Sequence, residues 1–83
     1  MINVQQTDQK AIFSGALTRA TITRAFDKKY RKLVDNECII LDLAKVSQVD
    51  TAGLAWILLL IELAASKACY ISLVNLTDDL LKI

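Results

Sequence analysis

The hydrophobic and polar positions at the start of the chain predict two short strands. Ile2 and Val4 would share one face of an extended segment, and a turn at residues 8–9 would lead into a second apolar run, residues 11–14. Gly15 marks the exit from that run. These residues therefore predict an antiparallel pair at the beginning of a sheet.

From residue 18 to residue 35 the apolar positions recur at helical spacing instead. The apolar stripe of this amphipathic helix is Ile22, Phe26, Tyr30, Leu33 and Val34. The other face carries six basic residues and two acidic ones, namely Arg19, Arg24, Lys28, Lys29, Arg31 and Lys32 with Asp27 and Asp35. A basic face could bind nucleic acid or anionic lipid. A solvated helix face is favoured, because the net charge is only +1 and no aromatic residues interleave with the lysines.

The remaining pattern alternates strands and helices. Residues 38–43 form a nearly continuous apolar run, which is typical of a central parallel strand buried on both faces. A polar loop at 44–48 leads to a long helix at 51–66, a strand at 70–74, and a short final helix capped by Thr77. The predicted fold is α/β, a single sheet in ββαβαβα order with helices packed on it, in one domain covering residues 1–83.

The long helix carries apolar side chains on two sides. At about 100° per residue, one stripe contains Leu54, Ile57, Leu58, Ile61 and Ala65, and we expect it to face the core. The second stripe contains Trp56, Leu59, Leu60 and Leu63. Either the domain encloses this helix, or the second stripe is a docking surface. The docking surface is favoured because so short a chain has little left to cover both sides. The partner could also be a second copy of the chain.

The composition excludes most catalytic chemistry. The chain of 83 residues has no histidine, which excludes Ser-His and Cys-His catalysis and every histidine-containing metal site. Two glycines are too few for a GxGxxG motif, and at positions 15 and 53 they are too far apart for a P-loop motif. Cys38 and Cys69 do not form a CxxC pair. We therefore predict no catalytic residue, metal site or cofactor, and interpret the chain as a binding module.

The sequence also indicates a cytoplasmic protein. Its first residues lack the positive region and apolar stretch of a signal peptide. The longest uncharged apolar run, residues 53–61, is far shorter than the roughly 20 residues that span a membrane, so we expect no direct membrane insertion. Free thiols in a reducing compartment are the favoured state of the two cysteines.

The segment 39–54 resembles the core pattern of STAS domains, the family of sulfate transporters and anti-sigma-factor antagonists. An apolar strand ends at Asp42-Leu43, a short loop follows, and Asp50-Thr51-x-Gly53-Leu54 opens a helix. In element order the resemblance covers nearly the whole chain, although the family's final helix normally continues further. The resemblance implies a STAS fold.

Within this family, residues 49–63 are most similar to the small cytoplasmic STAS subunit of the Mla phospholipid ABC transporter, which maintains outer-membrane lipid asymmetry in Gram-negative bacteria. This similarity implies a non-enzymatic subunit, peripheral to the inner membrane, whose exposed helix face binds the transporter's ATPase with Thr51 at the contact. The alternative is an anti-sigma-factor antagonist whose affinity for an anti-sigma kinase depends on phosphorylation of Thr51. Antagonists typically carry Asp-Ser-Ser-Gly, whereas this chain has Asp50-Thr51-Ala52-Gly53.

Three residues at the start of the long helix also have structural explanations. Asp50 is predicted to cap the helix through its carboxylate. Thr51 is explained equally well by such a structural role and by a contact or regulatory role. Gly53 is expected where the first turn of the helix approaches another backbone closely.

Overall fold

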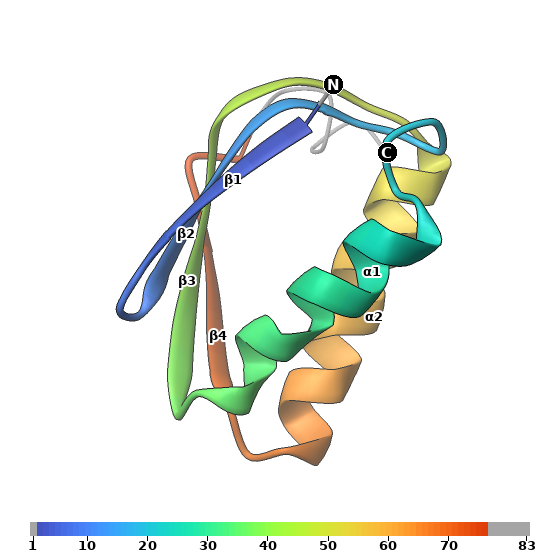
Figure 1. The fold of residues 1–83 in the computed structure, drawn as a ribbon. Coiled ribbons are helices and arrows are strands. Elements are labelled where there is room, and N and C mark those ends of the chain that lie inside the picture. Colours follow the sequence, from blue (N-terminus) through green and yellow to red (C-terminus); the bar gives the residue numbers. More distant parts are fainter. Residues whose placement is uncertain (1, 77–83) are drawn as a thin grey trace.

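Four strands form one mixed sheet in the computed structural model, which describes residues 2–76 (Figure 1). The strands are β1 (Ile2–Thr7), β2 (Lys10–Leu17), β3 (Cys38–Val49) and β4 (Tyr70–Val74), in the spatial order β1-β2-β3-β4. β1 pairs antiparallel with β2, whereas β3 runs parallel to both β2 and β4. The predicted antiparallel start and parallel centre of the sheet are therefore confirmed.

The helices lie together on one face of this sheet (Figure 1). They are α1 (Arg24–Tyr30), which continues into the 3₁₀ helix η1 (Arg31–Asp35), and α2 (Thr51–Ser66). The largest fully buried side chains, among them Phe13, Leu41 and Leu60, come from both layers, so the core lies between the sheet and the helices. No helix within residues 2–76 is long and apolar enough to cross a membrane. The predicted final helix at Thr77 lies outside the described residues.

The first helix is shorter than the predicted span of residues 18–35. Its cap is Thr23, whose side chain accepts a hydrogen bond from the Phe26 N–H. Upstream, the Thr21 hydroxyl donates to the Ala16 carbonyl and accepts from the Thr18 N–H, which holds this segment in a turn. Threonine side chains compete in this way with helical backbone bonds, and the apolar period cannot reveal it.

β3 differs from the sequence prediction in two respects. It continues through the predicted loop at 44–48, because Val46 and Val49 enter the core while register shifts against β2 accommodate the polar residues between them. It is also buried on one face only, since Ile39 and Leu41 are fully buried whereas Ile40 is 37% exposed. The prediction of burial on both faces was wrong.

Candidate partner-binding surface

The junction between β2 and α2 is fixed by the carboxylate of Asp50. Its Oδ1 accepts a hydrogen bond from the Gly53 N–H at 2.9 Å, and its Oδ2 accepts one from the Arg19 N–H at 2.9 Å. These bonds, led by that from Arg19, hold the pKa of Asp50 below its usual value. The predicted capping role of Asp50 is confirmed, and the same side chain also fixes the segment that follows β2.

Gly53 is placed where α2 passes closest to β2. A Cβ atom at this position would lie 2.0 Å from the carbonyl oxygen of Leu17. Since no side chain can fit that distance, the close backbone approach expected from the sequence is confirmed. The first turn of α2 is therefore held firmly against the end of β2.

Thr51 is the first residue of α2 and lies exposed at its N-terminus. Because Asp50 supplies the cap, capping does not explain the threonine. Its hydroxyl makes no hydrogen bond within residues 2–76. A role for Thr51 in contact or regulation stays a prediction, and the side chain is accessible for it.

The sequence analysis predicts Trp56 on an exposed docking stripe of α2, but the structure buries it. It is only 5% exposed, and its ring centroid lies 5.0 Å from that of Phe26 in α1 and 6.0 Å from that of Phe13 in β2. Its indole N–H donates to Asp27 Oδ1 at 2.9 Å. Trp56 therefore joins the two helices and the sheet within the core of the chain itself.

The other predicted contact residues of α2 differ in how far they are exposed. Leu60 is fully buried, and Leu63 is half-buried and packs against the core, whereas Leu59 is 37% exposed. The buried line of α2 runs through Gly53, Trp56, Ile57, Leu60 and Ala64, which takes members from both predicted stripes. The expectation that the first stripe alone faces the core was wrong, because the core-facing direction lies between the two stripes.

The exposed side of α2 forms a surface that we call the α2 ridge. It consists of Thr51, Ala55, Leu58, Leu59 and Glu62, with the two leucines at its apolar centre. Leu58 is 56% exposed, the largest exposed fraction among the leucines described. The prediction that Leu58 faces the core was wrong. Small residues do not signal the buried direction of α2, because Ala55 is exposed whereas Gly53 and Ala64 are buried.

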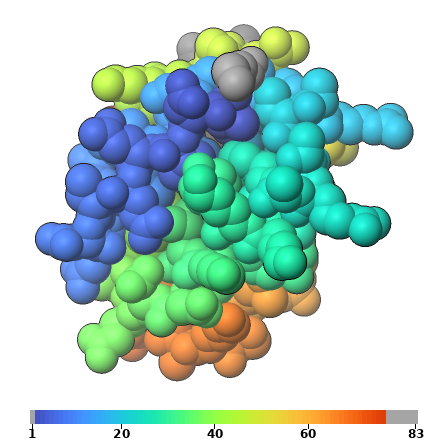
Figure 2. Space-filling model, viewed as in Figure 1, coloured from blue at the N-terminus to red at the C-terminus, as the bar shows by residue number. Residues whose placement is uncertain are grey.

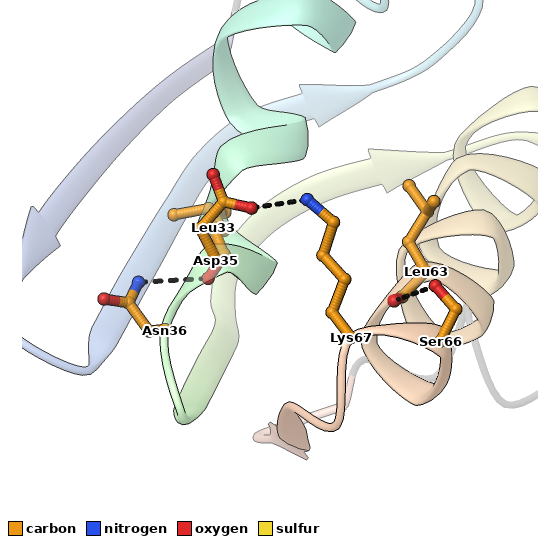
Figure 3. A network of polar contacts seen from close by, with 6 residues as sticks. All are labelled: Leu33, Asp35, Asn36, Leu63, Ser66 and Lys67. Carbon is orange, nitrogen blue, oxygen red and sulfur yellow. Dashed lines mark hydrogen bonds and ion pairs between the residues drawn. The ribbon is translucent and has the colours of Figure 1, made fainter.

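Polar contacts tie the end of α2 to η1 (Figure 3). Lys67 Nζ, one residue beyond α2, forms an ion pair with Asp35 Oδ1 of η1. On either side of it, Asn36 Nδ2 donates to the Leu33 carbonyl and Ser66 Oγ donates to the Leu63 carbonyl. The two helical segments are thus joined at this end by charge and near Trp56 by packing.

The chain's thiols and carboxylates do not assemble into a reactive site in the part of the chain that the structure describes. Cys38 and Cys69 are free, and burial raises the pKa of the Cys69 thiol, which disfavours its nucleophilic thiolate form. No group of three or more potential metal-ligating side chains occurs within residues 2–76.

Solved structures of other proteins share the fold of this chain. The chain resembles the anti-sigma factor antagonist SpoIIAA in its unphosphorylated form with a TM-score of 0.71 and 16% sequence identity, covering 99% of this chain and 79% of that one. It also resembles a crystal structure of Mglu with a TM-score of 0.61 and 11% identity, covering 92% of this chain but only 20% of the other. At these identities the likeness shows the fold alone. No curated protein matches the chain.

A family model identifies the chain more specifically than the fold does. The model described as "Mlab, STAS domain" matches residues 2–83, nearly the whole sequence. This match agrees with the sheet order, and with the Asp50 cap and the close approach at Gly53, which lie in the segment that resembles STAS domains. The chain therefore belongs to the MlaB family of STAS domains.

Proposed function

We propose that this chain is a non-enzymatic accessory subunit that binds the ATPase of an Mla-type phospholipid ABC transporter through the α2 ridge. In this role it works in the cytoplasm of a Gram-negative bacterium, at the inner membrane through the transporter, and supports outer-membrane lipid asymmetry. It stabilises or regulates the ATPase by contact, and the ATPase supplies the nucleotide chemistry.

The observation that carries this proposal is the exposed pair Leu58 and Leu59 at the centre of the α2 ridge. Both leucines lie outside the buried line of α2, which contributes Trp56 and Leu60 to the core. Exposed apolar side chains surrounded by small and polar ones are typical of the centre of a protein interface. The family match supports the identity of the partner.

The experiment measures the affinity of the full chain for the purified ATPase subunit of the source organism's Mla transporter. Leu58→Asp should weaken binding by about thirtyfold or more, as expected for a charge introduced at the centre of an interface. The matched control is Tyr70→Asp, which places the same charge at an 82% exposed position on β4, away from α2. The proposal fails if the wild-type chain does not bind the ATPase, or if both variants lose the same affinity.

An anti-sigma-factor antagonist remains the second candidate. Two observations favour it, the fold shared with SpoIIAA and the exposed hydroxyl of Thr51 at the N-terminus of α2. Phosphorylation there would add a charge of about −1.5 to −2 beside the apolar ridge. Binding of the chain to an anti-sigma kinase instead of the ATPase, with loss of that binding in Thr51→Glu and retention in Thr51→Val, would establish this function.

The α2 ridge could also pair two copies of the chain. In that case the wild-type chain would run as a dimer during size-exclusion chromatography, Leu58→Asp would run as a monomer, and neither protein would bind the ATPase. This outcome would replace both proposed partners.

A further inference from the structure

A groove of about 470 Å³ lies between α1–η1 and the C-terminal end of α2. Figure 2 shows the face of the molecule on which α1 and η1 lie (teal to green). Five cationic side chains line the groove together with two carboxylates; the cations are Arg24, Lys28, Arg31, Lys32 and Lys67. The groove therefore has an excess of three positive charges, although the whole chain has a net charge of only +1.

Both carboxylates of the groove already have partners. Asp27 Oδ2 pairs with Arg31 at 2.7 Å, and its Oδ1 accepts the bond from Trp56. Asp35 pairs with Lys67. The excess charge therefore belongs to the three remaining cations, none of which forms an ion pair with the residues described.

These three cations are Arg24, Lys28 and Lys32, spaced four residues apart along α1 and η1. All three line the same groove, and Arg24 and Lys28, about one turn apart in α1, are separated by about 6 Å along the helix axis. In an extended peptide, alternate side chains point the same way and are about 6.8 Å apart. An extended segment with acidic residues at alternate positions could therefore place one carboxylate against each cation.

We propose that this groove binds an acidic segment of the protein that covers the α2 ridge. The identity of that protein as the ATPase rests on the proposed function. The preference of the groove for an acidic segment does not. Trp56 points toward α1, and Leu59 lies about 60° around the helix from it, so the apolar ridge and the basic groove border each other. A partner seated on Leu58 and Leu59 would have its neighbouring chain within reach of the groove.

The shape of the groove favours a peptide over a bilayer or a nucleic acid. A flat anionic membrane would meet the rim of the concave groove before the cations along its walls. A nucleic acid would present a continuous row of phosphates, whereas the unpaired cations extend over only about 12 Å.

The test uses the full chain and a fluorescein-labelled peptide in which glutamates alternate with serines. We expect salt-dependent binding by the wild type and none to the matched peptide with glutamines in place of glutamates. Lys28→Glu/Lys32→Glu should weaken binding about tenfold or more. The matched control Lys29→Glu/Lys45→Glu makes the same charge change outside the groove and should stay within about twofold of the wild type. Far-UV circular dichroism checks that every variant is folded.

Several outcomes would overturn the inference. They are failure of the wild type to bind the glutamate peptide, equal losses in both double variants, and binding of phosphatidylglycerol vesicles or poly(U) RNA in place of the peptide. The Leu58→Asp variant should still bind the peptide but should no longer bind the ATPase. Loss of ATPase binding alone therefore counts against the α2 ridge, whereas loss of peptide binding alone counts against the groove.

Discussion

The indole of Trp56 must be buried for its apolar area and must also find an acceptor for its N–H. Both conditions are met because Asp27 comes from α1, 29 residues away along the chain. Periodicity along α2 cannot detect such a long-range partner. The apolar pattern of α2 therefore predicts an exposed interface anchor at Trp56, whereas the side chain is part of the core.

We predict that Trp56→Ala lowers the free energy of unfolding by about 3–5 kcal/mol, because it removes a large buried ring and leaves a cavity between three elements. The matched control Leu58→Ala should change it by no more than about 0.5 kcal/mol, since Leu58 is 56% exposed. Urea denaturation followed by far-UV circular dichroism measures both. Equal losses would show that Trp56 and Leu58 are equally buried, and would contradict the orientation of α2.

The lowered pKa of Asp50 predicts that the stability of the fold depends on pH. Its pKa is lowered in the folded state by the N–H groups of Arg19 and Gly53, so the carboxylate stabilises the fold above the pKa of the unfolded chain. This contribution is lost as the pH falls through the lowered pKa of the folded state. In Asp50→Asn, the amide oxygen can still accept one of the two bonds, but the side chain does not titrate in this range.

We therefore expect the wild type to lose more stability than Asp50→Asn between about pH 7 and about pH 3, where aspartates titrate. The difference between the two proteins should be largest near neutral pH and should narrow in acid. Thermal unfolding at a series of pH values measures it. Two curves that stay parallel over the whole range would contradict the role assigned to the Asp50 carboxylate.

At the scale of the elements, the ends of α2 could be predicted from the sequence, but its rotation about its own axis could not. Its beginning and end are marked by local signals, the Asp50 cap and the polar residues after Ala65, so they could be predicted. Its rotation could not, because eight large apolar side chains in twelve residues surround most of the helix. Only the sheet and α1 determine which of them are buried.

Gly53 gives a test of that rotation. Gly→Ala inside a helix normally stabilises a protein by about 1 kcal/mol. Here we expect the opposite, a loss of about 1–3 kcal/mol or more, because the new methyl group would meet the Leu17 carbonyl oxygen at 2.0 Å. The sign of the change in unfolding free energy is the measurement. Unchanged or increased stability of Gly53→Ala would mean that α2 does not contact β2 through this face.

At the scale of the whole molecule, the order of the elements could be predicted better than their lengths. Each of the seven described elements falls in a segment where the apolar period or a turn residue indicates it. The shorter α1 results from hydrogen bonds that Thr21 and Thr23 make with residues nearby in the chain, whereas the longer β3 results from contacts with distant segments. The prediction that β3 is buried on both faces failed for the same reason, since a hydrophobic run does not show on which face the helices pack.

The last prediction tests whether the folded chain covers one face of its sheet or both. Ile39 and Ile40 are consecutive residues of β3 and point to opposite faces, with Ile39 fully buried under the helices and Ile40 37% exposed. Ile39→Ala should therefore cost about 2–5 kcal/mol of unfolding free energy, and Ile40→Ala less than about 1 kcal/mol. The two variants remove the same atoms from the same strand, so strand propensity cancels in the comparison. Equal losses would mean that the face carrying Ile40 is also covered, and that the domain has three layers instead of two.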